Sequence, residues 1–66
     1  MNVYEIRILN EDHRTSAIIE ASHMSDYAAI RSACKLASGS AVEVWRALEC
    51  IYQEPADSSD RQRRIA

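Results

Sequence analysis

Four side chains of this sequence have the chemistry to bind a transition metal: His13, His23, Cys34 and Cys50. No two of them lie at the close spacing that structural zinc sites use. His13 falls in a polar stretch, His23 just before an expected helix, Cys34 within that helix and Cys50 on an expected strand. We therefore expect two solvent-facing histidines, two half-buried thiols, no metal and no cofactor.

The stretch around His13 also contains Asp12 and Ser16, which are residue types found in nucleophilic active sites. Such sites need a loop that binds the developing oxyanion and a scaffold deep enough to form a pocket. A chain of 66 residues with a single glycine offers neither. Glu5 and Glu20, which could be neighbours on a sheet, are expected to be solvated rather than to act as acid and base. We predict that the protein is not an enzyme.

The distribution of charge bears on nucleic-acid binding. Residues 1–54 carry eight acids and five bases, whereas the segment from Pro55 carries two acids and the bases Arg61, Arg63 and Arg64. An acidic folded part repels phosphate backbones unless its bases cluster on one side. Nucleic acid is therefore a disfavoured partner. A small nucleic-acid-associated regulator that uses this basic tail is the alternative function.

The elements that would position these residues can be read from the alternation of apolar and polar side chains. Residues 1–9 and 16–21 alternate with a period of two, which is typical of strands, and the polar residues 10–15 between them suit a hairpin loop. Tyr4, Ile6 and Ile8 would share the buried face of the first strand. In the second strand we expect Ile19 to point inward, since the opposite choice would bury a glutamate without a partner.

A helix is expected to begin after Ser25, which is a favourable N-cap, and Asp26 would place negative charge in its first turn. Met24 is expected to pack on Ala29 as a hydrophobic staple. Gly39 would supply the left-handed residue that ends the helix. The apolar stripe expected to face the sheet consists of Ile30, Ala33, Leu36 and Ala37, with Ala29 and Cys34 at its edges.

Residues 40–54 are long for one strand in so small a domain, and a hairpin with its turn at Ala47-Leu48 is the better interpretation. These turn residues are poor, because tight hairpin turns prefer asparagine and glycine. The hairpin pairs apolar with apolar and base with acid, namely Val44 with Ile51 and Arg46 with Glu49.

Together these elements predict an α+β fold with the order strand, strand, helix, strand, strand. Residues 1–54 would form one small domain, an antiparallel sheet with the helix packed on one face, and residues 55–66 a disordered polar tail. The order of the strands stays open, and parallel pairing of the two strands that flank the helix is one alternative.

Several segments resemble a group of very short uncharacterised alphaproteobacterial proteins. These segments are Tyr4–Leu9, Ala28–Ala33, Glu43–Arg46 and Cys50–Tyr52. The resemblance covers roughly residues 3–53 and implies a small cytoplasmic protein of unknown function, with no catalytic residues to carry over. Relatives often have glycine near position 47, so Ala47 would be a departure from the group.

One helix covers one face of such a sheet, and the other face is the candidate interface: Ile18, Trp45, Cys50, Tyr52 and Arg7. Large aromatics among charges resemble an interface, although a half-apolar face with Trp45 packed on its neighbours is equally consistent. A chain this short buries only about 60% of its unfolded surface, which favours self-association.

We therefore expect a non-enzymatic protein-interaction module that acts as a homodimer or a docking subunit. The sequence contains neither an apolar signal-peptide core nor an apolar run of membrane-spanning length. We expect a cytoplasmic protein, no membrane partner and reduced thiols.

Overall fold

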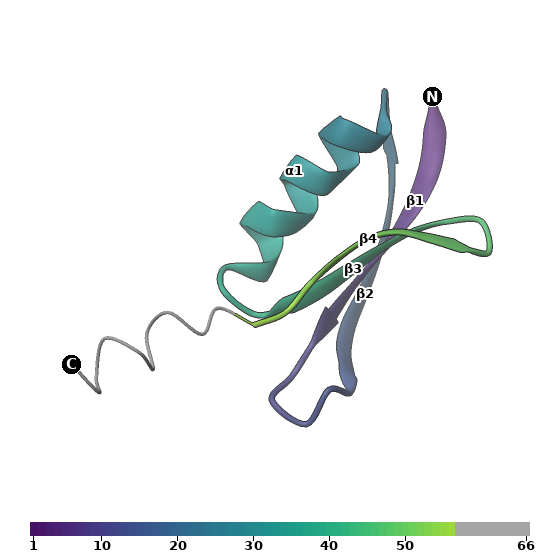
Figure 1. The fold of residues 1–66 in the computed structure, drawn as a ribbon. Coiled ribbons are helices and arrows are strands. Elements are labelled where there is room, and N and C mark those ends of the chain that lie inside the picture. Colours follow the sequence, from purple (N-terminus) through teal and green to yellow (C-terminus); the bar gives the residue numbers. More distant parts are fainter. Residues whose placement is uncertain (57–66) are drawn as a thin grey trace.

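The computed structural model describes residues 1–56. The chain runs through strand β1 (Asn2–Leu9), strand β2 (Thr15–His23), helix α1 (Asp26–Ala37), strand β3 (Ala41–Arg46) and strand β4 (Glu49–Glu54). The four strands form one sheet, and α1 lies across one of its faces (Figure 1). The predicted α+β class and element order are confirmed. From residue 57 onward, the predicted tail lies outside the described residues.

The strands lie side by side in the order β2-β1-β3-β4, and every neighbouring pair is antiparallel. β1 therefore separates β2 from β3, which run in the same direction, and α1 is the connection that crosses over β1. The strands that flank the helix do not pair with each other, because β1 occupies the place between them. β2 and β4 are the two edges of the sheet.

The core lies between α1 and the two central strands. Tyr4 and Ile6 of β1 and Val42 and Val44 of β3 are almost completely buried, as expected for Tyr4 and Ile6 from the alternation. The helix contributes three small residues one turn apart, namely Ala29, Ala33 and Ala37. Residues four apart lie on one face of a helix, so these alanines form a continuous seam against the sheet.

The expected apolar stripe is only partly correct. Ile30 packs against the core, and the alanines at 33 and 37 are buried, but Leu36 is 52% exposed. The alanine seam takes the position nearest the sheet, and this turns Leu36 to the flank of the helix. On β2, Ile19 packs against the core as predicted, whereas Ile18 is 61% exposed on the other face.

The helix begins as the sequence predicts. The Ser25 hydroxyl accepts a hydrogen bond from the backbone N–H of Ala28 at 3.1 Å, which satisfies one of the free donors of the first turn. At the other end Ser38 adopts the left-handed conformation (φ 51°), and Gly39 follows with φ 93°. Gly39 is thus left-handed as expected, but Ser38 is the cap. The staple prediction is wrong, because Met24 is 81% exposed.

The first hairpin loop is organised by one side chain. The Oδ1 atom of Asn10 accepts hydrogen bonds from the backbone N–H groups of Asp12 at 2.9 Å and Arg14 at 3.0 Å. The carboxamide thereby holds the loop in shape, as asparagine commonly does in turns. The loop joins Leu9 to Thr15, which agrees with the expected polar connection.

The second hairpin turns at Ala47 and Leu48, and Arg46 lies opposite Glu49, so both predictions are confirmed. Ala47 adopts φ 56°. A positive φ at the first central residue is what tight hairpin turns require, and a residue with a Cβ adopts it at a cost.

The register beyond this turn differs from the prediction. Val44 lies opposite Tyr52 and not Ile51, because the register shifts between Val44 and Trp45. Trp45 pairs with Cys50, so Ile51 is the additional residue of a β-bulge. The bulge brings both Ile51 and Tyr52 toward the core, where each packs at its margin.

Candidate functional site

The face of the sheet opposite α1, here called the open face, carries side chains in rows that cross all four strands. One row consists of Glu20, Glu5, Trp45 and Cys50, and the next of Ile18, Arg7, Glu43 and Gln53. Four of the five residues expected in the interface therefore share this face: Ile18, Trp45, Cys50 and Arg7.

A chain of polar contacts occupies the centre of the open face. The guanidinium carbon of Arg7 lies 4.5 Å from the centroid of the Trp45 ring, within the range of a cation–π contact. Arg7 also forms an ion pair with Glu5. On the other side, the indole Nε1 of Trp45 donates a hydrogen bond to Glu43 at 3.0 Å. Trp45 is thus packed locally, with Arg7 as its partner.

Around this centre the open face exposes aliphatic side chains. Val3 is 56% exposed and Ile18 is 61% exposed, and Trp45 is itself half-buried. Cys50 is exposed beside Trp45. The surface is therefore neither a plain polar face nor an apolar patch, but apolar groups interrupted by charges.

The charges of the open face are unbalanced. Within residues 1–56, Glu5, Glu20 and Glu43 face one base, Arg7, and Glu5 lies directly opposite Glu20 across β1 and β2. Like charges in that position repel each other. Among the described residues, Glu20 takes part in no side-chain hydrogen bond or ion pair, whereas Glu5 and Glu43 each accept one. The carboxylate of Glu20 is therefore available to a cation from outside.

An open hollow of about 400 Å³ adjoins these carboxylates. It lies where β1 begins and is lined by Asn2, Val3, Tyr4, Glu5, Glu20, Arg46 and Ala47. The hollow extends the open face around the end of the sheet.

Tyr52 does not lie on the open face, which corrects the sequence prediction. The β-bulge places it opposite Val44 on the helix side, where its hydroxyl is 3.9 Å from the thiol of Cys34. The hydroxyl donates a hydrogen bond to Glu54, which also accepts one from Cys34 at 3.5 Å. The alternation of β4 alone could not reveal this, because an inserted residue reverses the alternation beyond it.

The hydrogen bond to Glu54 raises the pKa of Tyr52 well above its ordinary value, and the contact with Cys34 acts in the same direction. Both contacts favour the neutral phenol. The cluster joins β4 to α1 through these contacts, so we assign it a structural role.

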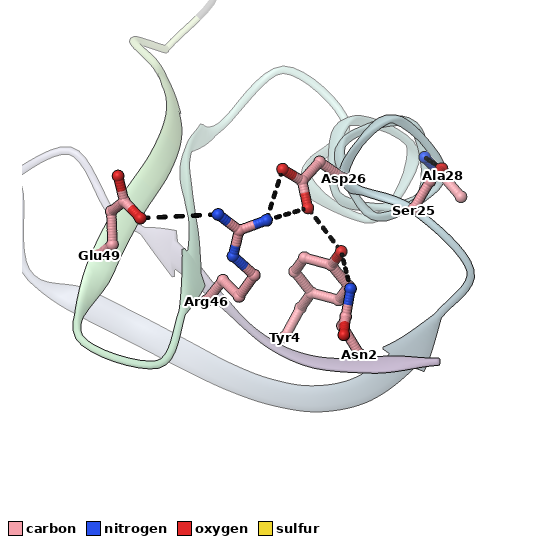
Figure 2. A network of polar contacts seen from close by, with 7 residues as sticks. All are labelled: Asn2, Tyr4, Ser25, Asp26, Ala28, Arg46 and Glu49. Atoms are coloured by element: carbon pink, nitrogen blue, oxygen red, sulfur yellow. Dashed lines mark hydrogen bonds and ion pairs between the residues drawn. The ribbon is translucent and has the colours of Figure 1, made fainter.

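A second polar cluster, which sequence reasoning missed, fixes the beginning of α1 to the sheet (Figure 2). Arg46 Nη1 donates to both carboxylate oxygens of Asp26 at 2.8 Å, and the Tyr4 hydroxyl donates to Asp26 at 2.6 Å. Arg46 Nη2 also lies 3.6 Å from Glu49. We call this set of contacts the Asp26 clamp. The sequence signalled Asp26 only as an acid in the first helical turn.

The clamp shifts the proton affinity of its charged members. The hydrogen bond from Tyr4 lowers the pKa of Asp26, and the charge and hydrogen bonds of Arg46 lower it further, although partial burial opposes them. The carboxylate of Asp26 raises the pKa of Arg46 in turn. Both groups are therefore charged near neutral pH, and their charges are already paired within the chain.

The candidate metal ligands are scattered. Cys34 lies on the helix side and Cys50 on the open face, and both are free thiols. His13 lies in the first loop, and His23 packs with its ring centroid 5.9 Å from that of Tyr4. Within residues 1–56 no group of three potential ligands comes together. In the same part of the chain, α1 is too short and polar to cross a membrane.

The basic tail residues Arg61, Arg63 and Arg64 lie outside the described residues, so the structure does not place them. Comparison with known proteins adds no assignment: no family model matches the chain, and no curated protein or solved structure matches it.

Proposed function

We propose that the protein is a non-enzymatic interaction module whose open face docks on a cationic surface of a partner protein. The observation that supports this most directly is the composition of that face. In the part of the chain that the structure describes, half-exposed aliphatic and aromatic side chains lie there among three carboxylates and one guanidinium.

The apolar part of the open face supports docking on a protein. Val3 and Ile18 are each more than half exposed, and Trp45 lies between their strands and β4. Covering such side chains removes apolar area from water, which is the main favourable term in protein association. Tryptophan and arginine are also the residues that most often dominate binding energy at interfaces. The pair formed by Arg7 and Trp45 would be the centre of the contact.

The charged part of the face selects the partner. The net negative charge of Glu5, Glu20 and Glu43 over Arg7 favours a surface rich in lysine or arginine and repels an acidic one. A second copy stacked with its own open face inward would bring these carboxylates against each other. The charge therefore supports a different, basic protein as the partner at this face, and it disfavours the phosphate backbone of a nucleic acid.

Reversal of one charge tests the proposal. In Glu20→Lys the open face loses an acid whose side chain forms no hydrogen bond or ion pair within residues 1–56, so the fold should persist. Glu11→Lys makes the same change of charge in the exposed first loop and is the matched control. The wild-type protein and both variants would be used for affinity capture from cytoplasmic extract, with and without nuclease, followed by mass spectrometry.

We expect basic proteins that the wild type and Glu11→Lys capture and Glu20→Lys does not. Equal capture by all three proteins would exclude the open face as the docking surface. Loss of capture after nuclease treatment would show that a nucleic acid carries the interaction, and failure of the wild type to capture any specific protein would contradict the docking function.

A further inference from the structure

The two edges of the sheet differ in how well they are protected against pairing with another strand. Exposed edges are usually shielded by charged residues, bulges or a short length. β4 has six residues, glutamate at each end and a bulge in its pairing with β3. β2 has nine residues, among which Glu20 is the one carboxylate and neither lysine nor proline occurs, and the register shift in its pairing with β1 lies near its beginning. Within residues 1–56, β2 from Ala17 onward is therefore the less protected of the two edges.

The β2 edge also exposes apolar side chains on both of its sides. Ile18 is 61% exposed on the open face, and Ile19 is only partly covered on the helix side. Leu36 adds to the helix side. Cys34 contacts β4, and two residues turn an α-helix by about 200°, so Leu36 lies on the flank that faces β2. Leu36 is 52% exposed there.

The sequence of β2 can pair with a copy of itself. In an antiparallel pair of identical strands related by a two-fold axis, residues directly opposite each other point to the same face of the sheet. One residue must therefore lie opposite its own symmetry mate, and the axis runs between the two; we name the axis by that residue. An axis through Glu20 would place two carboxylates opposite each other. An axis through Ile19 pairs Ile19 with its symmetry mate, Ala17 with Ala21, and Ile18 with Glu20. This register uses residues 17–21, which follow the register shift in the pairing of β2 with β1.

We propose that a second copy of this chain pairs with β2 in this register, so that the two sheets join into one with both helices on the same side. The reasons are the weaker protection of this edge, the apolar residues on both of its sides and its self-complementary sequence. A chain of 66 residues has a small core, and association is a common way for such chains to gain stability. The inference does not depend on docking at the open face.

Two substitutions at Ile18 separate this register from others. Ile18 lies opposite Arg7 in its own sheet, so Ile18→Glu gains a cross-strand ion pair within one chain. In the proposed dimer, the glutamate at position 18 of each copy would lie opposite Glu20 of the other copy, which gives two symmetric like-charge pairs. The dissociation constant of the dimer should therefore rise about tenfold. Ile18→Lys would instead face Glu20 with the opposite charge, and the dimer should be as tight as the wild type or tighter.

The measurement is sedimentation equilibrium over a range of concentrations, with circular dichroism as the check on folding. Gln53→Lys, at an exposed position of the β4 edge, is the control and should leave the dimer unchanged. A wild-type protein that stays monomeric at all concentrations would overturn the proposal. So would equal weakening by Ile18→Glu and Ile18→Lys, because an axis through Ile18 itself predicts that result.

Discussion

Replacement of Glu20 by glutamine should stabilise the fold, because Glu20 lies directly opposite Glu5 with no counter-ion of its own among residues 1–56. Opposed side chains on antiparallel strands have Cβ atoms about 5 Å apart, and like charges there cost on the order of 0.2–1 kcal/mol. Coulomb's law in water gives about 0.7 kcal/mol at a carboxylate separation of about 6 Å. The ion pair of Glu5 with Arg7 offsets part of this repulsion. We therefore expect a gain of about 0.5 kcal/mol in the free energy of unfolding.

Urea denaturation followed by circular dichroism would measure this gain at low and at high salt. For a domain of this size the same gain corresponds to a rise of about 2–4 °C in the melting temperature. The Debye length falls from about 30 Å at 0.01 M salt to about 3 Å at 1 M, so the difference between Glu20→Gln and wild type should shrink as salt is added. Glu11→Gln in the first loop is the matched control and should change stability little.

A stability gain that is independent of salt would contradict an electrostatic origin, and a loss of stability would refute the assignment of Glu20 as an unpaired, repelled carboxylate. The same variant should bind a cationic partner more weakly if the open face is the docking surface. Stability and affinity would then change in opposite directions, which a substitution that merely damages the fold cannot produce.

Three further outcomes are expected. Ala47→Gly should raise the free energy of unfolding by about 0.5–1 kcal/mol, because the relief of left-handed strain at φ 56° exceeds the cost of the greater entropy of the unfolded chain. Thermal melts would measure this change, and a lower melting temperature would speak against strain in the turn. In Glu54→Gln the charged acceptor of the Tyr52 hydroxyl is lost, so ultraviolet titration should show that the pKa of Tyr52 moves back toward its ordinary value of 10.0. The lowered pKa of Asp26 gives stability that is present above pH 3.8 and is lost as the pH falls through that lowered pKa. The free energy of unfolding of Asp26→Asn should therefore depend less steeply on acid pH than that of the wild type. Identical pH dependence of the two proteins would show that the carboxylate of the clamp contributes nothing to stability.

The sequence was sufficient for the features that depend on local patterns. Period-two alternation identified the buried residues of β1, a capping serine identified the start of α1, and the pairing of Arg46 with Glu49 identified the second turn. Each of these follows from residues close together in the chain.

The features that the sequence did not reveal depend on residues far apart or on one extra residue. The bulge at Ile51 leaves no mark in the composition of β4, yet it moves Tyr52 to the helix side. In the Asp26 clamp, Asp26 binds Tyr4, which is 22 positions away in the sequence, and Arg46, which is 20 positions away. No local sequence pattern predicts such contacts. The contact of Arg7 with Trp45 likewise required the order of the strands, which the alternation leaves open.

The alanine seam of α1 has a consequence for how the helix is held in place. Ala29, Ala33 and Ala37 present nearly identical methyl groups to the sheet at intervals of one turn. If the helix slid along its axis by one turn, about 5.4 Å, each alanine would replace the next, and the seam alone would hardly resist. Asp26, bound to Tyr4 and Arg46, has no equivalent one turn further along, where Ile30 lies. The clamp therefore fixes the position of α1 along its own axis, which the contact between the alanine seam and the sheet alone leaves undetermined.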